Sequence, residues 1–318
     1  MNTNLLINSI TNPTLLFFIL GVLATIVKSD LEIPQSTSRF ISLYLLFAIG
    51  FKGGQELQHS GFNAEILKAL TVCMAFAALV PLYTFFILKK KLNAENAGAI
   101  AATYGSVSAV TFVTATIFLD TMNVAFGGHM VAAMALMEAP AIMIGVILMR
   151  RFSSEKTSLR ISTLLHESLT NSSVFIITGS LVIGLIADAK GAEGIKPFTT
   201  DIFKGFLSIF LLEMGMLAAK RFASFKRYGL SMSAFALLIP LINACTSIYI
   251  TYLLHLPAGD RLLIAILTAS ASYIAVPAAM KQAAPGADPG LYVPMALGIT
   301  FPFNITFGLP LYWMLIQL

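Results

Sequence analysis

The sequence predicts an all-α integral membrane protein with ten transmembrane helices, and three observations lead to this prediction. Hydrophobic residues make up 57% of the 318 residues and charged residues only 11%, against roughly 25% charged in an average soluble domain. The mean hydropathy is +0.84. Apolar stretches of about 20 residues, the length that crosses a bilayer core of about 30 Å, recur along the chain. These values exclude a soluble globular domain, a disordered chain and a disulfide scaffold.

The ten apolar stretches, called spans 1 to 10 below, follow one another with short polar connections. They lie at residues 13–28, 37–52, 66–88, 95–118, 129–149, 171–188, 202–219, 229–254, 260–282 and 291–316. The two cysteines, Cys73 and Cys245, fall inside these stretches, so we expect neither a disulfide nor a thiolate metal site.

The distribution of basic residues predicts the orientation of the chain. Of the 20 Lys and Arg residues, 14 lie in the connections after spans 1, 3, 5, 7 and 9 or at the span ends that border them. By the positive-inside rule these connections are cytoplasmic, so both termini are expected outside the cell (inner) membrane. The net charge of +5 is thereby explained without a nucleic-acid partner.

A polar linker at residues 151–167 divides the chain into two halves of five spans, residues 1–150 and 168–318. Short matches recur in the same order in both halves, two of them at an offset of 159 residues. The matches are Ser9–Asn12 with Ser168–Asn171, Leu79–Leu82 with Leu238–Leu241, and Met134–Leu136 with Met295–Leu297. Because five is an odd number, the second half enters from the opposite side. The sequence therefore predicts two inverted repeats, an architecture of many secondary transporters.

Spans 4 and 9 carry the pattern that predicts a binding site. Each has a cluster of small and hydroxyl residues in its middle, Thr103–Thr111 in span 4 and Thr268–Pro277 in span 9. Pro277 removes a helical hydrogen bond. We expect both helices to break near the bilayer midplane, where two half-helix N-termini offer N–H groups to a small anion. The alternative interpretation is that the small residues only permit tight helix packing.

Ionisable residues within membrane spans are costly and usually functional. Glu138 in span 5 is interpreted as a cation ligand or proton carrier, or alternatively as a structural partner of Lys52. Glu213 in span 7 is a second such carboxyl group, whereas Glu56 is interpreted as a solvated loop residue. Asn243 and Asn304 are polar but uncharged; they lie in spans 8 and 10.

Enzyme chemistry finds little support in the chain. His166-Glu167 begins like a zinc-protease helix, but Thr170 stands where the second histidine is required. The sequence has no nucleophile elbow, phosphate loop or dinucleotide fingerprint. The four histidines lie near span ends and are interpreted as interface residues. We therefore predict no enzyme and no cofactor, and a protein that acts on an existing gradient or passively.

The sequence resembles the sodium-dependent bicarbonate transporters first recognised in cyanobacteria, as a divergent bacterial member of that family. The likeness covers nearly the whole chain. Its motifs are Ile49–Gly54, Tyr104–Ser108, Glu138–Ala141, Glu167–Leu169, Met214–Met216 and Ala284–Pro289.

The resemblance implies ten spans in five-plus-five inverted repeats, a homotrimer, and elevator-type movement of a core domain that carries bicarbonate and sodium. It also implies that bicarbonate is held mainly by backbone amides and hydroxyls at the two breaks. In this chain the corresponding residues are Gly105, Ser106, Val107, Ser108, Thr111, Ala269, Ser270, Ala271 and Ser272.

Two departures from the family pattern affect coupling and regulation. Tyr273 stands where an acidic residue is expected, so the oxygen ligands left for sodium are Thr111, Glu138, Ser272 and Asn304, besides backbone carbonyls. The cyanobacterial members also have a longer cytoplasmic linker, through which a trimeric PII-like protein regulates them. The shorter linker argues against the same regulator, although a basic cytoplasmic face remains.

The leading hypothesis is a secondary active transporter that takes up bicarbonate, or a similar small anion, by symport with sodium. One alternative is a carrier of the same fold for another small carboxylate or with proton coupling. The other is a membrane receptor that binds a ligand at the breaks without transporting it. The short linker and the lack of an appended soluble domain disfavour the receptor.

Overall fold

The computed structural model describes residues 13–60, 63–153, 170, 172–224, 229–273, 275–284 and 286–318. Within these residues the regular structure is helical throughout. The predicted linker lies largely outside the described residues, as do Ser9–Asn12 and His166-Glu167.

Each of the ten apolar stretches coincides with a helix or a series of helical segments. The elements are α2 (Pro13–Ile26), α3 (Gln35–Ser60), α4 (Ala64–Leu88), α5 (Ala94–Gly105), α6 (Ala109–Thr121), α7 (His129–Phe152), α9 (Ser172–Ile186), α10 (Ala189–Lys196), η1 (Pro197–Asp201), α11 (Phe203–Ser224), α12 (Gly229–Leu253), α13 (Ala258–Ala269), α14 (Ala275–Ala283), α15 (Pro289–Met295), η3 (Ala296–Thr300), α16 (Phe301–Phe303), η4 (Asn304–Gly308) and α17 (Leu309–Gln317).

Helices long and apolar enough to cross a membrane confirm the predicted class, an all-α membrane protein. Among the described residues there are five such segments, α4, α5 with α6, α7, α12, and α15 to α17. Shorter apolar helices occur at Leu16–Ile26 and Phe175–Ile186. Large apolar side chains on the outer faces are exposed, for example Leu238 and Ile242 on α12, as expected for contact with lipid.

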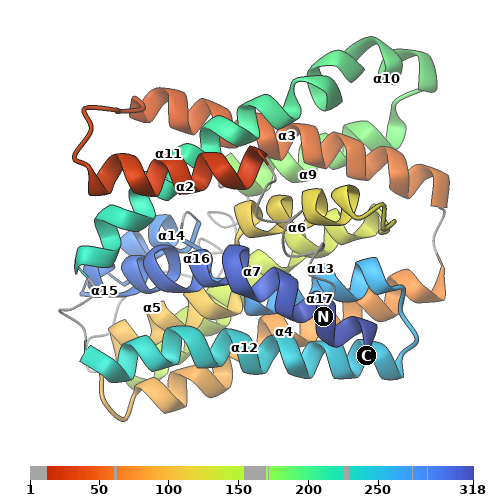
Figure 1. Ribbon diagram of the computed structural model, residues 1–318. Coiled ribbons are helices and arrows are strands. Elements are labelled where there is room, and N and C mark those ends of the chain that lie inside the picture. The colour runs from red at the N-terminus through yellow and green to blue at the C-terminus, as the bar shows by residue number, and fades with distance from the viewer. Residues whose placement is uncertain are drawn as a thin grey trace.

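The helices form two layers, which Figure 1 shows one above the other. The four-helix layer contains α2, α3, α9 and α11 together with the short α10 and η1. The broken-helix layer contains α4 to α7 and α12 to α17. Each half of the chain contributes helices to both layers, so the halves interleave and do not form separate bodies.

Close backbone contacts through glycine define the four-helix layer. A Cβ atom on Gly54 of α3 would lie 2.1 Å from the Leu181 carbonyl oxygen of α9, and one on Gly184 would lie 2.1 Å from the Phe51 carbonyl oxygen. The α2–α11 pair is equally tight around Gly21. Small residues permit this approach, which is a common way to pack helices inside a bilayer.

The last apolar stretch is irregular in a way that the sequence prediction did not foresee. Between α15 and α17 the chain forms π-helical turns, η3 and η4, on either side of the three-residue α16. Pro302 lacks a backbone N–H and so cannot donate the usual helical hydrogen bond. Wider turns of this kind often occur at functional sites, and here η4 begins at Asn304, which contacts the break in span 9.

Candidate functional site

The helices of spans 4 and 9 are both interrupted, as predicted. Residues 106–108 separate α5 from α6, and α13 likewise ends before α14 begins at Ala275. The backbone leaves the first helix at Ser106 with φ −85° and ψ 177°, and leaves the second at Ser270 with φ −85° and ψ 170°. The two breaks therefore begin with nearly the same backbone geometry.

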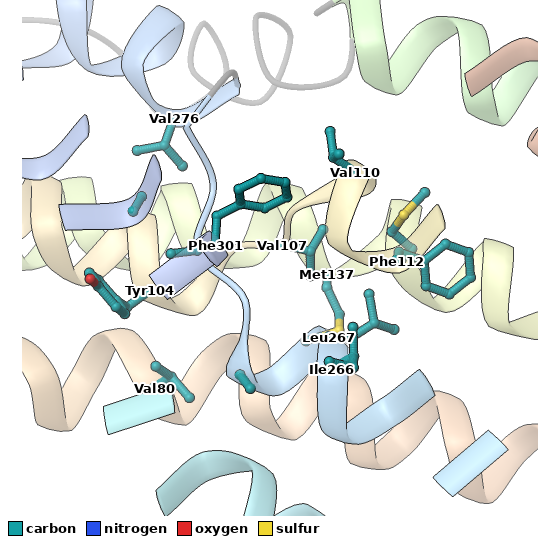
Figure 2. Close-up of a cluster of buried hydrophobic side chains, with 14 of the residues drawn as sticks. Val80, Tyr104, Val107, Val110, Phe112, Met137, Ile266, Leu267, Val276 and Phe301 are labelled. Carbon is teal, nitrogen blue, oxygen red and sulfur yellow. The ribbon is translucent and has the colours of Figure 1, made fainter. Parts of the chain in front are cut away.

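Apolar side chains surround the two breaks. Val107, Met137 and Phe301 are among the buried residues that Figure 2 shows packed around them. The polar backbone of each break is thereby removed from bulk solvent, and an unmet hydrogen bond there is costly.

The two breaks bind each other directly. The Ser108 N–H donates to Ser270 Oγ at 3.0 Å, and the Ser272 N–H donates to the Thr103 carbonyl oxygen at 2.9 Å. The Ser270 hydroxyl in turn donates to the Leu267 carbonyl oxygen. Each break thus supplies partners to the other, so the two interrupted helices form one unit.

Serine side chains cap the helices that follow the breaks. Ser108 Oγ accepts from the Thr111 N–H at 3.2 Å and from the Thr111 hydroxyl at 2.9 Å. In the second break, Ser272 Oγ accepts from the Val276 N–H at 3.4 Å. Such a cap satisfies one of the first N–H groups of a helix and leaves others available.

The carbonyl ends before the second break already have partners. Asn243 donates its side-chain amide to the Thr268 carbonyl oxygen at 3.1 Å, and Asn304 donates to that of Ala269 at 2.8 Å. The Tyr312 hydroxyl donates to Asn304 Oδ1 at 3.2 Å. These negative helix ends are occupied, whereas the positive N-terminal ends of α6 and α14 face a cavity.

That cavity, called the substrate cavity below after the role proposed for it, has a volume of about 40 Å³ and lies between the two layers. The first residues of α6 and α14, Ala109 and Ala275, both line it, so two helix N-termini open on one small space. Leu46 of α3 and Ile177 of α9 close it from the four-helix layer. Two such N-termini favour an anion.

The structure brings only some of the predicted substrate residues to the cavity. Val107, Ser108 and Ser272 line it, while the remaining predicted residues, Gly105, Ser106, Thr111, Ala269, Ser270 and Ala271, support the breaks behind it. The side-chain oxygens of Thr103 and Ser106 are buried and have no hydrogen-bond partner among the described residues. Asn304 lies outside the cavity, and its part in cation coupling stays a prediction.

Glu138 on α7 lines the same cavity and is 9% exposed. Within the described part of the chain, its carboxyl group has no ion pair within 4.0 Å and no hydrogen bond. The alternative interpretation, a structural pair with Lys52, is wrong, because the two described side chains form no ion pair and line different cavities. A buried carboxylate without a partner is suited to bind a cation or a proton.

Two polar features differ from the sequence prediction. His129 is buried and pairs with Asp260, with 3.3 Å between His129 Nε2 and Asp260 Oδ2. The Gly127 N–H also donates to Asp260 Oδ1 at 2.7 Å. His129 is therefore an internal residue that joins the start of α7 to the start of α13, not an interface residue. Glu56 lies within α3 and is half-buried, not in a solvated loop.

Two interrupted membrane helices and a buried carboxyl group share one small cavity, an arrangement typical of membrane carriers of small ions. Comparison with protein families agrees with this class. The model of the Na+-dependent bicarbonate transporter superfamily matches residues 13–317, nearly the whole chain. The chain therefore belongs to this superfamily, and a transporter family fits the prediction that it is not an enzyme. No curated protein matches the chain.

Proposed function

We propose that the protein is a secondary active transporter that takes up bicarbonate together with sodium. The observation that carries the proposal is the convergence of the α6 and α14 N-termini and Glu138 on one cavity between the layers. Membership of the superfamily supports both the anion and the cation.

The anion would bind at the N-terminal ends of α6 and α14. Free N–H groups and positive helix ends there stabilise a negative charge, and the Ser108 and Ser272 hydroxyls lie beside them. A volume of about 40 Å³ accommodates only a few heavy atoms. This size favours bicarbonate over a larger carboxylate, which is the alternative substrate class.

A cation must accompany the anion, because uptake works against an inside-negative potential. That potential costs roughly 2.3 kcal/mol per charge per 100 mV. One sodium ion cancels this cost for a monovalent anion, and a second makes the potential drive uptake. Glu138, with the hydroxyls of Ser108 and Ser272, supplies hard oxygen ligands of the kind that sodium accepts. The second candidate is proton coupling, which the unpartnered state of Glu138 favours.

We further propose an elevator-type mechanism with ten spans in two inverted repeats, assembled as a homotrimer. The nearly equal geometry at Ser106 and Ser270 supports a repeat. The broken-helix layer would carry the ions past the four-helix layer, whose Leu46 and Ile177 cover the cavity. A cytoplasmic regulator would bind at the basic inner face.

Both termini are expected outside the inner membrane, because 14 of the 20 Lys and Arg residues fall on the other side. An alkaline phosphatase fused after Leu318 should be active, and one inserted near Ser154 should be inactive. A green fluorescent protein at the same two positions should give the opposite pattern. A cytoplasmic C-terminus would overturn the ten-span arrangement.

The test of the function is uptake of labelled bicarbonate into proteoliposomes that hold the purified protein. We expect an inward sodium gradient to drive bicarbonate accumulation at least tenfold above the level in protein-free liposomes. A potassium gradient of the same size should drive no accumulation. An excess of butyrate, a larger carboxylate, added to the outer solution in the same assay should compete weakly if bicarbonate is the substrate. Binding without flux would indicate the receptor.

A further inference from the structure

A second cavity, of about 90 Å³, lies farther along the boundary between the two layers. It shares three helices with the substrate cavity. On α3 the second cavity begins just after Leu46, which lines the substrate cavity, and extends to Lys52 and Glu56. On α6 the second cavity extends to Thr116 and Asp120. At 1.5 Å per residue, these positions lie roughly 9 to 17 Å beyond the substrate cavity. The two cavities therefore follow one another along the same boundary.

The second cavity differs from the first in its charge. Lys52 and Glu56 from α3 and Lys204 from α11 stand on the four-helix side, and Asp120 stands at the end of α6 on the other side. None of these four side chains has an ion-pair partner within 4.0 Å among the described residues. Charged residues are only 11% of this chain, so four in one cavity are a concentrated set.

The charges influence one another and remain accessible to water. Lys52 and Asp120 are the charged groups that act electrostatically on the Glu56 carboxyl group. Lys52, Asp120 and Lys204 are exposed, and Glu56 is half-buried. Two ammonium groups and two carboxylates without direct pairing leave each charge able to meet a mobile ion of the opposite sign.

We propose that this cavity is an outer vestibule, in which the two lysines receive a small monovalent anion and the two carboxylates receive an alkali cation before both pass to the substrate cavity. The inference rests on the proposed function and on the proposed orientation, which puts the C-terminal ends of α3 and α6 outside. A cavity lined by charges of one sign would repel one of the two co-transported ions. Because this cavity carries both positive and negative charges, it can admit an anion together with a cation.

The transport test uses the opposite effects of the two kinds of charge. Lys204→Gln should raise the KM for bicarbonate roughly threefold and lower the KM for sodium, since one charge at about 6 Å in water acts with that strength. Asp120→Asn should do the reverse. Both shifts should shrink at high ionic strength.

Lys190→Gln is the matched control, since Lys190 is an exposed lysine on the neighbouring α10 and does not line the vestibule. If Lys204 and Asp120 had only a structural role, each substitution would change both KM values in the same direction. If the cavity had no role in transport, neither KM value would change. Either result would overturn the vestibule while wild-type transport continued. Absence of bicarbonate flux in the wild type would instead overturn the proposed function.

A labelling test does not depend on transport. In a Cys73→Ala, Cys245→Ser background, Thr200→Cys places a thiol on the vestibule wall, and Gly194→Cys on α10 serves as a reference with open surroundings. Impermeant thiosulfonates added outside should label both positions. The labelling rate of an anionic reagent is divided by that of a cationic reagent at each position. The double substitution Lys52→Gln and Lys204→Gln should lower this ratio several-fold at position 200 and leave it unchanged at position 194. Labelling of position 200 only from the inside, or an unchanged ratio, would overturn the proposal.

Discussion

Replacing Ser108 by leucine is expected to abolish bicarbonate uptake while the protein still inserts into the membrane. Ser108 is 5% exposed and lies where the substrate cavity meets the N-terminus of α6. Its hydroxyl accepts from both the N–H and the hydroxyl of Thr111. Leucine removes that acceptor, which costs about 1 kcal/mol as a lost helix cap, and its side chain fills space that the anion needs.

Two further substitutions separate lost hydrogen bonding from lost space. Ser108→Ala keeps the cavity open, and loss of one hydrogen bond to a charged group, about 1.5 to 3 kcal/mol, should lower the apparent affinity for bicarbonate roughly tenfold to a hundredfold. Thr114→Leu is the matched control, because the Thr114 hydroxyl bonds only within its own helix and does not line the cavity. Normal uptake by a stably inserted Ser108→Leu protein would mean that the serines serve only for packing.

The two breaks could be predicted from the sequence because their cause is local. Clusters of small and hydroxyl residues such as Thr103–Thr111 interrupt an otherwise apolar helix, and the serine that leaves the helix is visible in the sequence itself. The direct bonds between the breaks could not be predicted in the same way. The bond from the Ser108 N–H to Ser270 joins residues far apart in the chain, and only the packing of the two halves brings them together.

The partners of charged residues were harder to predict, because they depend on the register of helices against one another. Lys52 and Glu138 are both membrane-region charges, yet α3 and α7 place them in successive cavities and not in contact. The His129–Asp260 pair was missed for the same reason, since neither residue has a local motif. The sequence pattern predicts a loop at Glu56 because this residue follows the apolar part of α3, whereas the helix continues to Ser60.

The side-chain amides of Asn243 and Asn304 supply the hydrogen-bond donors that an interrupted membrane helix needs, and the sequence predicts this only in part. An interrupted membrane helix leaves carbonyl groups that must find donors within the protein. The sequence shows polar residues in neighbouring helices, but only the structure shows that they donate to the Thr268 and Ala269 carbonyl groups. With these carbonyls satisfied, the positive helix ends remain for the substrate. This division would make one break both stable and able to bind the proposed anion.

Glu138→Gln is expected to remove the dependence of uptake on sodium and to lower the transport rate at physiological sodium at least tenfold. Glutamine has nearly the same shape but no negative charge, so the substitution removes the charged ligand from the substrate cavity and keeps its volume. Loss of one charge-assisted contact corresponds to roughly tenfold to a hundredfold in apparent sodium affinity. Initial rates at increasing sodium concentration, with a fixed membrane potential, measure this change.

The choice of control decides what this result means. Glu213 is also a buried carboxyl group, 9% exposed, but it belongs to α11 and does not line the substrate cavity. Glu213→Gln should therefore retain the sodium dependence of the wild type, and a loss in both variants would indicate damage to packing. If wild-type uptake is unchanged when potassium replaces sodium but collapses with a protonophore, sodium coupling is rejected. Glu138 would then act as the proton carrier, because a proton is the other cation that a buried carboxylate without a partner can bind and release.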